Sequence, residues 1–133
     1  MDLVVVDASV LIAVVTNKTR KEQLVKMTQK VNLIGPRSVH WEIGNAFSAM
    51  FKRKRISIEE AIQAVNDYLQ IPIRFVDIEL EDTLRIAHSL NIYAYDAYLI
   101  RSAIKYNSPL LSLDRKLLEK ARLAKVQVVE VTL

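Results

Sequence analysis

The sequence predicts a three-layer α/β/α protein with a central, mainly parallel sheet of four or five strands. Short apolar runs alternate along the chain with longer amphipathic segments, which is the pattern of strand–helix–strand units. Hairpin-turn signals are few, so successive strands are expected to run parallel. The 133 residues include only 2 glycines and 3 prolines and show no repeat or low-complexity segment. We therefore expect a single domain, residues 1–133.

The strands are predicted from apolar runs. The Leu-Val-Val-Val run of residues 3–6 is continuous and β-branched, as in a strand that is buried on both faces. Later strands are expected at residues 31–34, 73–78, 109–113 and 126–131. Gly35 and Pro36 are expected to close the second strand.

Helices are predicted where apolar residues recur at helical spacing. The expected helices span residues 8–16, 19–30, 38–54, 57–69, 79–90, 95–106 and 115–123. Ser38 is the predicted N-cap of the third helix. Ser57 opens the fourth helix, because Glu60 stands at the capping-box position three residues later.

Composition narrows the class of protein. The absence of cysteine excludes disulfides, thiolate metal sites and cysteine nucleophiles, which fits a cytoplasmic protein. The first apolar run breaks at Asp7, so the sequence predicts neither a signal peptide nor a membrane span. The net charge of +4 favours a polyanionic partner, although general solubility is an equally simple explanation.

Four carboxylates stand where apolar surroundings make a lone charge costly: Asp7, Glu42, Asp96 and Asp114. Asp7 and Asp114 directly follow predicted strands, and Asp96 lies in the first turn of a helix. Because ligands of open α/β sheets bind at the carboxyl ends of the strands, we expect the four acids to share one site for a hard cation, Mg²⁺ or Mn²⁺. Helix capping by the aspartates and a solvated Glu42 are the alternatives at the single positions.

The motifs around these acids, in order along the chain, resemble those of PIN domain nucleases. Residues 5–11 read Val-Val-Asp-Ala-Ser-Val-Leu, Glu42 is a helical acid in the first third, and residues 95–99 read Tyr-Asp-Ala-Tyr-Leu. The last motif is Ser112-Leu113-Asp114, with serine where the family usually has threonine. The resemblance covers the whole chain and is greatest to the VapC toxins of type II toxin–antitoxin modules.

The resemblance implies a Mg²⁺- or Mn²⁺-dependent ribonuclease, a cognate antitoxin as partner, and a homodimer. It assigns Asp7, Asp96 and Asp114 as metal ligands, and Glu42 as a ligand or as the group that orients water. Three neighbouring side chains are expected to position these carboxylates: Ser9, Asn45 and Ser112.

Basic residues near the first and third helices are expected either to contact an RNA backbone or simply to be solvated. These residues are Lys18, Arg20, Lys21, Arg53, Lys54 and Arg55. The acidic segment from Asp77 to Asp82 is expected to lie in solvent. Three aromatic residues of the third helix are expected in a dimer surface or in the core: Trp41, Phe47 and Phe51.

Three other functions are compatible with parts of this pattern. A PIN-like domain that only binds, and a PIN nuclease of RNA processing rather than a toxin, would share the motifs. A phosphoacceptor receiver domain fits less well, because Asp7 stands alone after the first strand and no lysine follows the last strand. The sequence contains no Ser-His-Asp elbow, P-loop or dinucleotide fingerprint.

Overall fold

The computed structural model describes residues 2–16 and 18–130, without the side chains of residues 18–21 and 27. One sheet of five parallel strands, in the order β3-β2-β1-β4-β5, forms the middle layer. The strands are β1 (Leu3–Val6), β2 (Asn32–Pro36), β3 (Ile73–Val76), β4 (Leu110–Ser112) and β5 (Val128–Glu130). The predicted parallel sheet is therefore confirmed, with five strands.

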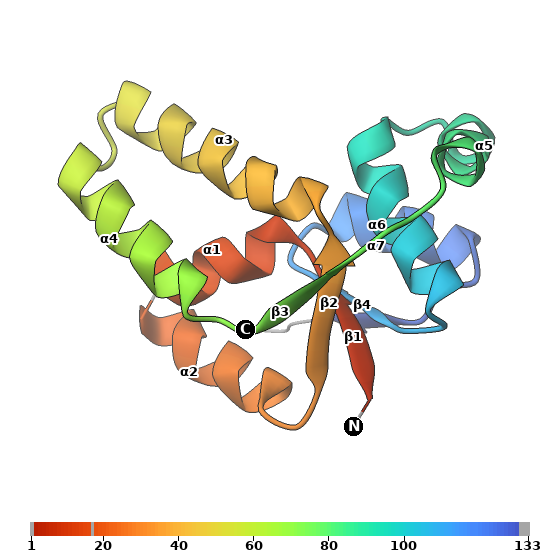
Figure 1. Ribbon diagram of the computed structural model, residues 1–133, viewed down its shortest axis with the longest axis horizontal. Helices are drawn as coiled ribbons and strands as arrows, with labels where there is room; N and C mark the ends of the chain where they lie inside the picture. The colour runs from red at the N-terminus through yellow and green to blue at the C-terminus, as the bar shows by residue number, and fades with distance from the viewer. Residues whose placement is uncertain (1, 17, 131–133) are drawn as a thin grey trace.

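Helices cover both faces of the sheet (Figure 1): α1 and α2 lie on one side, and α6 and α7 on the other. The helices are α1 (Ala8–Thr16), α2 (Lys18–Thr28), α3 (Ser38–Lys52), α4 (Ile58–Leu69), α5 (Leu80–Leu90), α6 (Ala94–Lys105) and α7 (Arg115–Leu123). Figure 1 also shows α3 and α4 as a pair that projects from the sheet, and α5 packs against α6. No described helix has the length and apolar character needed to cross a membrane.

The central strand β1 fixes where the site forms. Val5 lies opposite Leu110 and Val6 opposite Leu111, and all four side chains are at most 2% exposed. This burial explains the continuous apolar run, because a parallel central strand has no solvent face. The residue that follows β1 is Asp7, and it emerges beside the end of β4 at the carboxyl edge of the sheet.

The prediction that Gly35 and Pro36 close the second strand is wrong. Both residues belong to β2, where Gly35 lies opposite Phe75 and Pro36 opposite Val76. A Cβ at position 35 would lie 3.3 Å from the Val6 carbonyl oxygen, so glycine allows β2 to approach β1 closely. Proline is tolerated at position 36 because it is the last residue of the strand.

The two predicted helix caps have different outcomes. Ser38 is not the N-cap of α3: Arg37 takes that position with φ −60° and ψ −24°, and it makes no side-chain cap hydrogen bond. The capping box of α4 is confirmed. Ser57 Oγ accepts a hydrogen bond from Glu60 N at 3.1 Å, and Glu60 Oε1 accepts one from Ser57 N at 3.0 Å.

Several predicted elements are too long. β3 ends at Val76 rather than residue 78, and β5 begins at Val128 rather than residue 126, while residue 131 lies outside the described part of the chain. The second helix is α2, which ends at Thr28 rather than residue 30. α3 ends at Lys52 because Lys54 has a φ of 58°, which is incompatible with a continuing helix.

Candidate functional site

Asp7 is a buried carboxylate at the carboxyl end of β1, and its side chain is 6% exposed. Its Oδ1 accepts hydrogen bonds from Ser9 Oγ at 2.6 Å and from Val10 N at 3.3 Å. Its Oδ2 accepts one from Ser112 Oγ at 2.5 Å. Burial raises the pKa of Asp7 above its ordinary value, although these hydrogen bonds act in the opposite direction.

The two serines bridge distant parts of the chain. Ser9 Oγ accepts a hydrogen bond from Leu113 N at 3.0 Å, and Ser112 Oγ accepts one from Asp114 N at 2.9 Å. Each hydroxyl thus donates to Asp7 and accepts from the backbone that leads into α7. This arrangement fixes the Asp7 carboxylate and the start of α7 relative to each other.

Glu42 lies in the second turn of α3 and is half-buried. Burial is the main reason that its pKa rises from 4.5 to about 7, and the negative charges of Asp7 and Asp96 raise it further. Asn45, one turn later, is exposed, and its side chain makes no hydrogen bond within the described part of the chain. The structure therefore shows no hydrogen bond between the Asn45 side chain and Glu42.

Asp96 lies in the first turn of α6 and is half-buried. The N-cap of this helix is Tyr93, without a side-chain cap hydrogen bond, so Asp96 does not play the capping role considered from the sequence. Burial raises the pKa of Asp96, and the charge of Asp114 adds to this shift. The carboxylate is left available to a ligand.

Asp114 is exposed and is the N-cap of α7. Its Oδ1 accepts hydrogen bonds from Lys116 N at 3.0 Å and from Leu117 N at 3.2 Å. The capping alternative is thus correct for Asp114. The charge of the Asp114 carboxylate also contributes to the raised pKa of Asp7 and of Asp96.

The four acids form a series of electrostatic neighbours: Asp96 and Asp7 each interact with Glu42, and Asp114 interacts with Asp96 and Asp7. Within the described side chains, no lysine, arginine or histidine forms an ion pair with any of them. The same part of the chain contains no group of three or more acidic, histidine or cysteine side chains already arranged to hold a metal. Such a set of carboxylate oxygens, without a cationic partner among the described side chains, fits a hard divalent cation.

The predicted RNA-contacting residues divide into two groups. Arg53, Lys54 and Arg55 are exposed just beyond the end of α3. Arg53 follows Glu42 by eleven residues, or roughly 16 Å along a helix axis. The side chains of the other three predicted residues lie outside the described part of the structure: Lys18, Arg20 and Lys21.

The acidic segment from Asp77 to Asp82 lies largely at the surface, as predicted, but Glu79 and Asp82 also form ion pairs that the sequence did not predict. Glu79 Oε2 accepts from Lys105 Nζ at 2.6 Å, and Glu79 Oε1 accepts from an Arg101 guanidinium nitrogen at 2.9 Å. Arg101 also lies 3.6 Å from Asp82. The Lys105 hydrogen bond, followed by that of Arg101, lowers the pKa of Glu79 to about 2. These pairs join the start of α5 to α6.

The aromatic residues of α3 occupy different environments. Phe47 is in the core at 2% exposed and Phe51 packs against it, whereas Trp41 is 68% exposed. Trp41 lines a cavity of about 390 Å³ between the first turns of α3 and α6, together with Tyr95 and Tyr98. From the sequence, Trp41 was expected either in a dimer surface or in the core. Its position directly before Glu42 was the one signal that could have placed it beside the acids.

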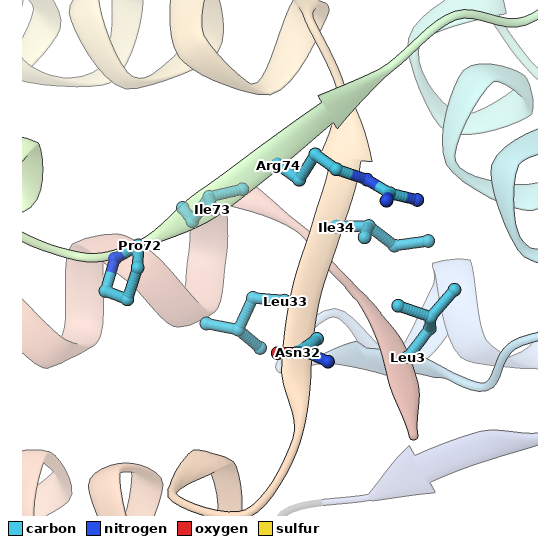
Figure 2. A pocket seen from close by; sticks show the side chains of 7 residues that line it. All are labelled: Leu3, Asn32, Leu33, Ile34, Pro72, Ile73 and Arg74. Atoms are coloured by element: carbon cyan, nitrogen blue, oxygen red, sulfur yellow. The ribbon is translucent and has the colours of Figure 1, made fainter. Parts of the chain in front are cut away.

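A second cavity, of about 460 Å³, lies at the amino-terminal half of the strands (Figure 2). Leu3, Ile34 and Arg74 point to one side of the strands, and Leu33 and Ile73 point to the other. Arg74 is the charged residue of this lining, which contains no carboxylate. Because the cavity is distant from the carboxyl edge and lacks acids, we assign it no part in the chemistry.

Comparison with known proteins agrees with this geometry. Solved structures similar to the chain include PAE2754 from Pyrobaculum aerophilum, with a TM-score of 0.76 and 22% identity over 98% of this chain and 91% of that one. VapBC2 from Rickettsia felis, bound to a DNA fragment from their promoter, has a TM-score of 0.72 and 12% identity over 98% and 99%. A domain of a functionally unknown protein from Methanocaldococcus jannaschii has a TM-score of 0.62 and 18% identity over 100% and 93%.

A search of curated protein sequences finds no match. The PIN domain family model matches residues 4–123, which include all four acids. PIN domains are nucleases and generally use divalent metal ions. Since the match extends over most of the chain, this protein belongs to the PIN domain family.

Proposed function

We propose that the protein is a Mg²⁺- or Mn²⁺-dependent endoribonuclease and the toxin of a toxin–antitoxin pair. The observation that supports the proposal is the set of four carboxylates at the carboxyl edge of the sheet. These carboxylates are close enough to repel one another, and none of them forms an ion pair with a described cationic side chain. A carboxylate set of this kind is stabilised by a divalent ion. Membership of the PIN family supplies the class of reaction, phosphodiester hydrolysis.

Asp7, Asp96 and Asp114 are the residues that would hold the ion. When bound, a divalent ion polarises a phosphoryl oxygen and lowers the pKa of a coordinated water. Ser9 and Ser112 position Asp7 through hydrogen bonds of 2.6 and 2.5 Å. Orientation of this kind reduces the reorganisation that a reaction requires.

Glu42 has a different role in this proposal. It is the acid with its pKa near 7, so at neutral pH it exchanges a proton readily. We assign it to bind the ion or to orient the attacking water. The exposed residues Arg53, Lys54 and Arg55 lie farther along α3 and would contact phosphates away from the scissile bond.

The proposed partners are RNA, a cognate antitoxin and a second copy of the chain, and the proposed place of action is the cytoplasm. The similarity in fold to the VapBC2 structure supports a toxin rather than an RNA-processing enzyme. A small reading frame for an antitoxin next to this gene would distinguish the two roles. PIN family membership removes the receiver-domain alternative.

The test is cleavage of a mixed RNA pool by the purified protein with Mg²⁺, Mn²⁺ or EDTA. We expect internal cleavage with either metal and none with EDTA. Glu81→Gln is the matched control, because within the described side chains this exposed carboxylate pairs with Arg85 alone, one turn later, and should be dispensable. Intact RNA under all three conditions would leave a PIN domain that binds without cutting.

A further inference from the structure

The cavity beside the acids has an aromatic lining that the proposed chemistry does not use. Its volume is about 390 Å³, and its walls include Trp41, Tyr95 and Tyr98, with Arg37 and Asp77 as charged lining residues. Trp41 is 68% exposed and Tyr95 is 58% exposed. Large apolar side chains exposed together around a hollow indicate a binding surface.

The aromatic residues and the acids come from the same two turns of helix. Trp41 directly precedes Glu42 in α3, and Tyr95 directly precedes Asp96 in α6. Trp41 and Tyr95 line the same cavity, so these turns lie close together, and the charge of Asp96 raises the pKa of Glu42. Figure 1 shows α3 beginning at the carboxyl end of β2, with α6 across from it. A ligand in the cavity would therefore lie next to the carboxylates.

The aromatic rings of the cavity pack edge to face against neighbouring rings. Tyr95 and Tyr98 pack edge to face, with centroids 5.9 Å apart and planes at 84°. Trp41 packs at 78° against His40 with centroids 4.8 Å apart, and His40 Nδ1 lies 3.0 Å from the Tyr68 hydroxyl. Supported rings lose little conformational freedom when a flat ligand stacks on them.

The charged lining residues could bind the phosphate and the polar edge of such a flat ligand. Arg37 is exposed, and its guanidinium carbon lies 5.7 Å from the centre of the Phe75 ring, which holds the cation at the cavity. Arg37 can donate to a phosphate or to a base edge, and Asp77 can accept from an exocyclic amine. A flat, hydrogen-bonding ring joined to an anion is a nucleotide.

We infer that this cavity is a subsite for one unpaired nucleobase, which stacks on Trp41 and Tyr95 while the adjoining phosphodiester lies at the acids. The inference rests on the proposed nuclease function and requires the base at this position to be unpaired, because a paired base cannot leave its stack to enter the cavity without a free-energy cost. The side chain of Trp41 selects for unpaired strands, and the carboxylates cut them.

Tryptophan fluorescence tests the subsite directly, because Trp41 is the one tryptophan of the chain. Asp7→Asn protein, which would bind without cutting, is titrated with short oligouridylate and oligoadenylate while anisotropy of a labelled strand reports binding. We expect Trp41 emission to fall as either strand binds. An abasic strand of equal charge and a duplex of equal length should leave the emission nearly unchanged.

Substitutions provide the second readout. Trp41→Ala should weaken binding of the single strands and raise the KM for their cleavage roughly tenfold, as expected for loss of one base–aromatic stack. Trp41→Phe should retain most of the affinity for single strands, because phenylalanine keeps an aromatic face. Leu123→Ala is the control: Leu123 is also 68% exposed, but it lies on α7 outside the cavity lining, and binding should be unchanged.

Strands that bind by anisotropy without changing Trp41 emission would overturn the subsite and would assign the cavity to a protein partner instead. Equal binding by wild type and Trp41→Ala would overturn it as well. Failure of the nuclease proposal gives a different result: quenching of Trp41 by single strands, with no cleavage by the wild-type protein in either metal.

Discussion

The protein has two acidic regions in which the pKa values of aspartate and glutamate side chains shift in opposite directions. At the carboxyl edge of the sheet, Asp7, Glu42 and Asp96 have raised pKa values, chiefly through burial. On the outer side of α6, Glu79 has its pKa lowered to about 2 by Lys105 and Arg101. α6 contributes to both regions, because Asp96 lies in its first turn and the two cations lie one and two turns later.

The difference lies in whether cations of the chain itself neutralise the acids. Glu79 and Asp82 have basic partners within 4 Å and connect two helices. The acids at the sheet edge repel one another and have no such partner among the described side chains, so folding alone leaves them unfavourable. Acids that destabilise the protein that carries them indicate function rather than architecture. This comparison makes four predictions.

The largest effect is expected for Asp7→Asn. RNA cleavage should fall at least about a hundredfold, because asparagine lacks the charge that holds a metal ion. The metal-free variant should nevertheless unfold at the same or a higher temperature than wild type, because a buried neutral amide is less costly than a buried carboxylate. Cleavage assays and thermal melts in EDTA measure the two effects. A variant that cuts RNA as well as wild type would contradict the comparison.

Metal should stabilise the sheet-edge acids and leave the outer acids unaffected. Mn²⁺ at about one hundred times its dissociation constant would add about 2.7 kcal/mol to the free energy of unfolding. Asp96→Asn should show a smaller rise in melting temperature with Mn²⁺, whereas Glu79→Gln should keep the full rise. Melting temperatures that do not respond to Mn²⁺ in wild type would show that the four acids do not form a metal site.

Glu42 should make the metal-free protein less stable as the pH rises. Its pKa is raised from 4.5 to about 7, so the folded protein holds this proton more tightly than the unfolded chain does. Its favourable contribution is complete below about pH 4.5 and is lost as the pH rises through 7. Denaturant unfolding in EDTA across this interval should show a steeper loss for wild type than for Glu42→Gln. Parallel curves would contradict the raised pKa.

Glu79 should show the smallest effect, with the opposite dependence on pH. Because its pKa is lowered, its contribution to stability is present above about pH 4.5 and is lost as the pH falls toward 2. Glu79→Gln should be slightly less stable than wild type at neutral pH, and added salt should reduce this difference, since the group is exposed. RNA cleavage should be unchanged. A large loss of cleavage would place Glu79 in the functional site and end the distinction between the two regions.

The sequence predicted the order of strands and helices because each depends on local patterns of apolar residues. The capping box of Ser57 and Glu60 was predictable for the same reason, since both partners lie within one turn. The Ser38 cap failed because Arg37 already has a helical conformation, which a list of preferred cap residues does not reveal. The predicted end of β3 and the predicted start of β5 were wrong because Ile78 and Val126 are apolar but lie outside the paired positions.

For the site, the sequence identified the acids but not their surroundings. Their proximity could be anticipated, because the carboxyl ends of parallel strands lie at the same edge of the sheet. The metal-binding roles of the four acids stay predictions. The bonds of Glu79 to residues 22 and 26 positions away depend on how α5 packs against α6, so the sequence predicted an exposed Glu79 but not its two partners. The cavity at Trp41 likewise needs two helices that are distant in the chain.

The hydrogen bond between Ser112 and Asp7 joins residues 105 positions apart. A contact of such long sequence separation has a loop-closure entropy cost that local contacts do not have, and it cannot form before both partners have been synthesised. A nascent chain that ends before β4 therefore lacks Ser112, one of the two serines that orient Asp7. The site is complete only after β4 and Asp114 have been synthesised. Under the proposed function, a nascent chain that ends before β4 would be unable to cleave RNA.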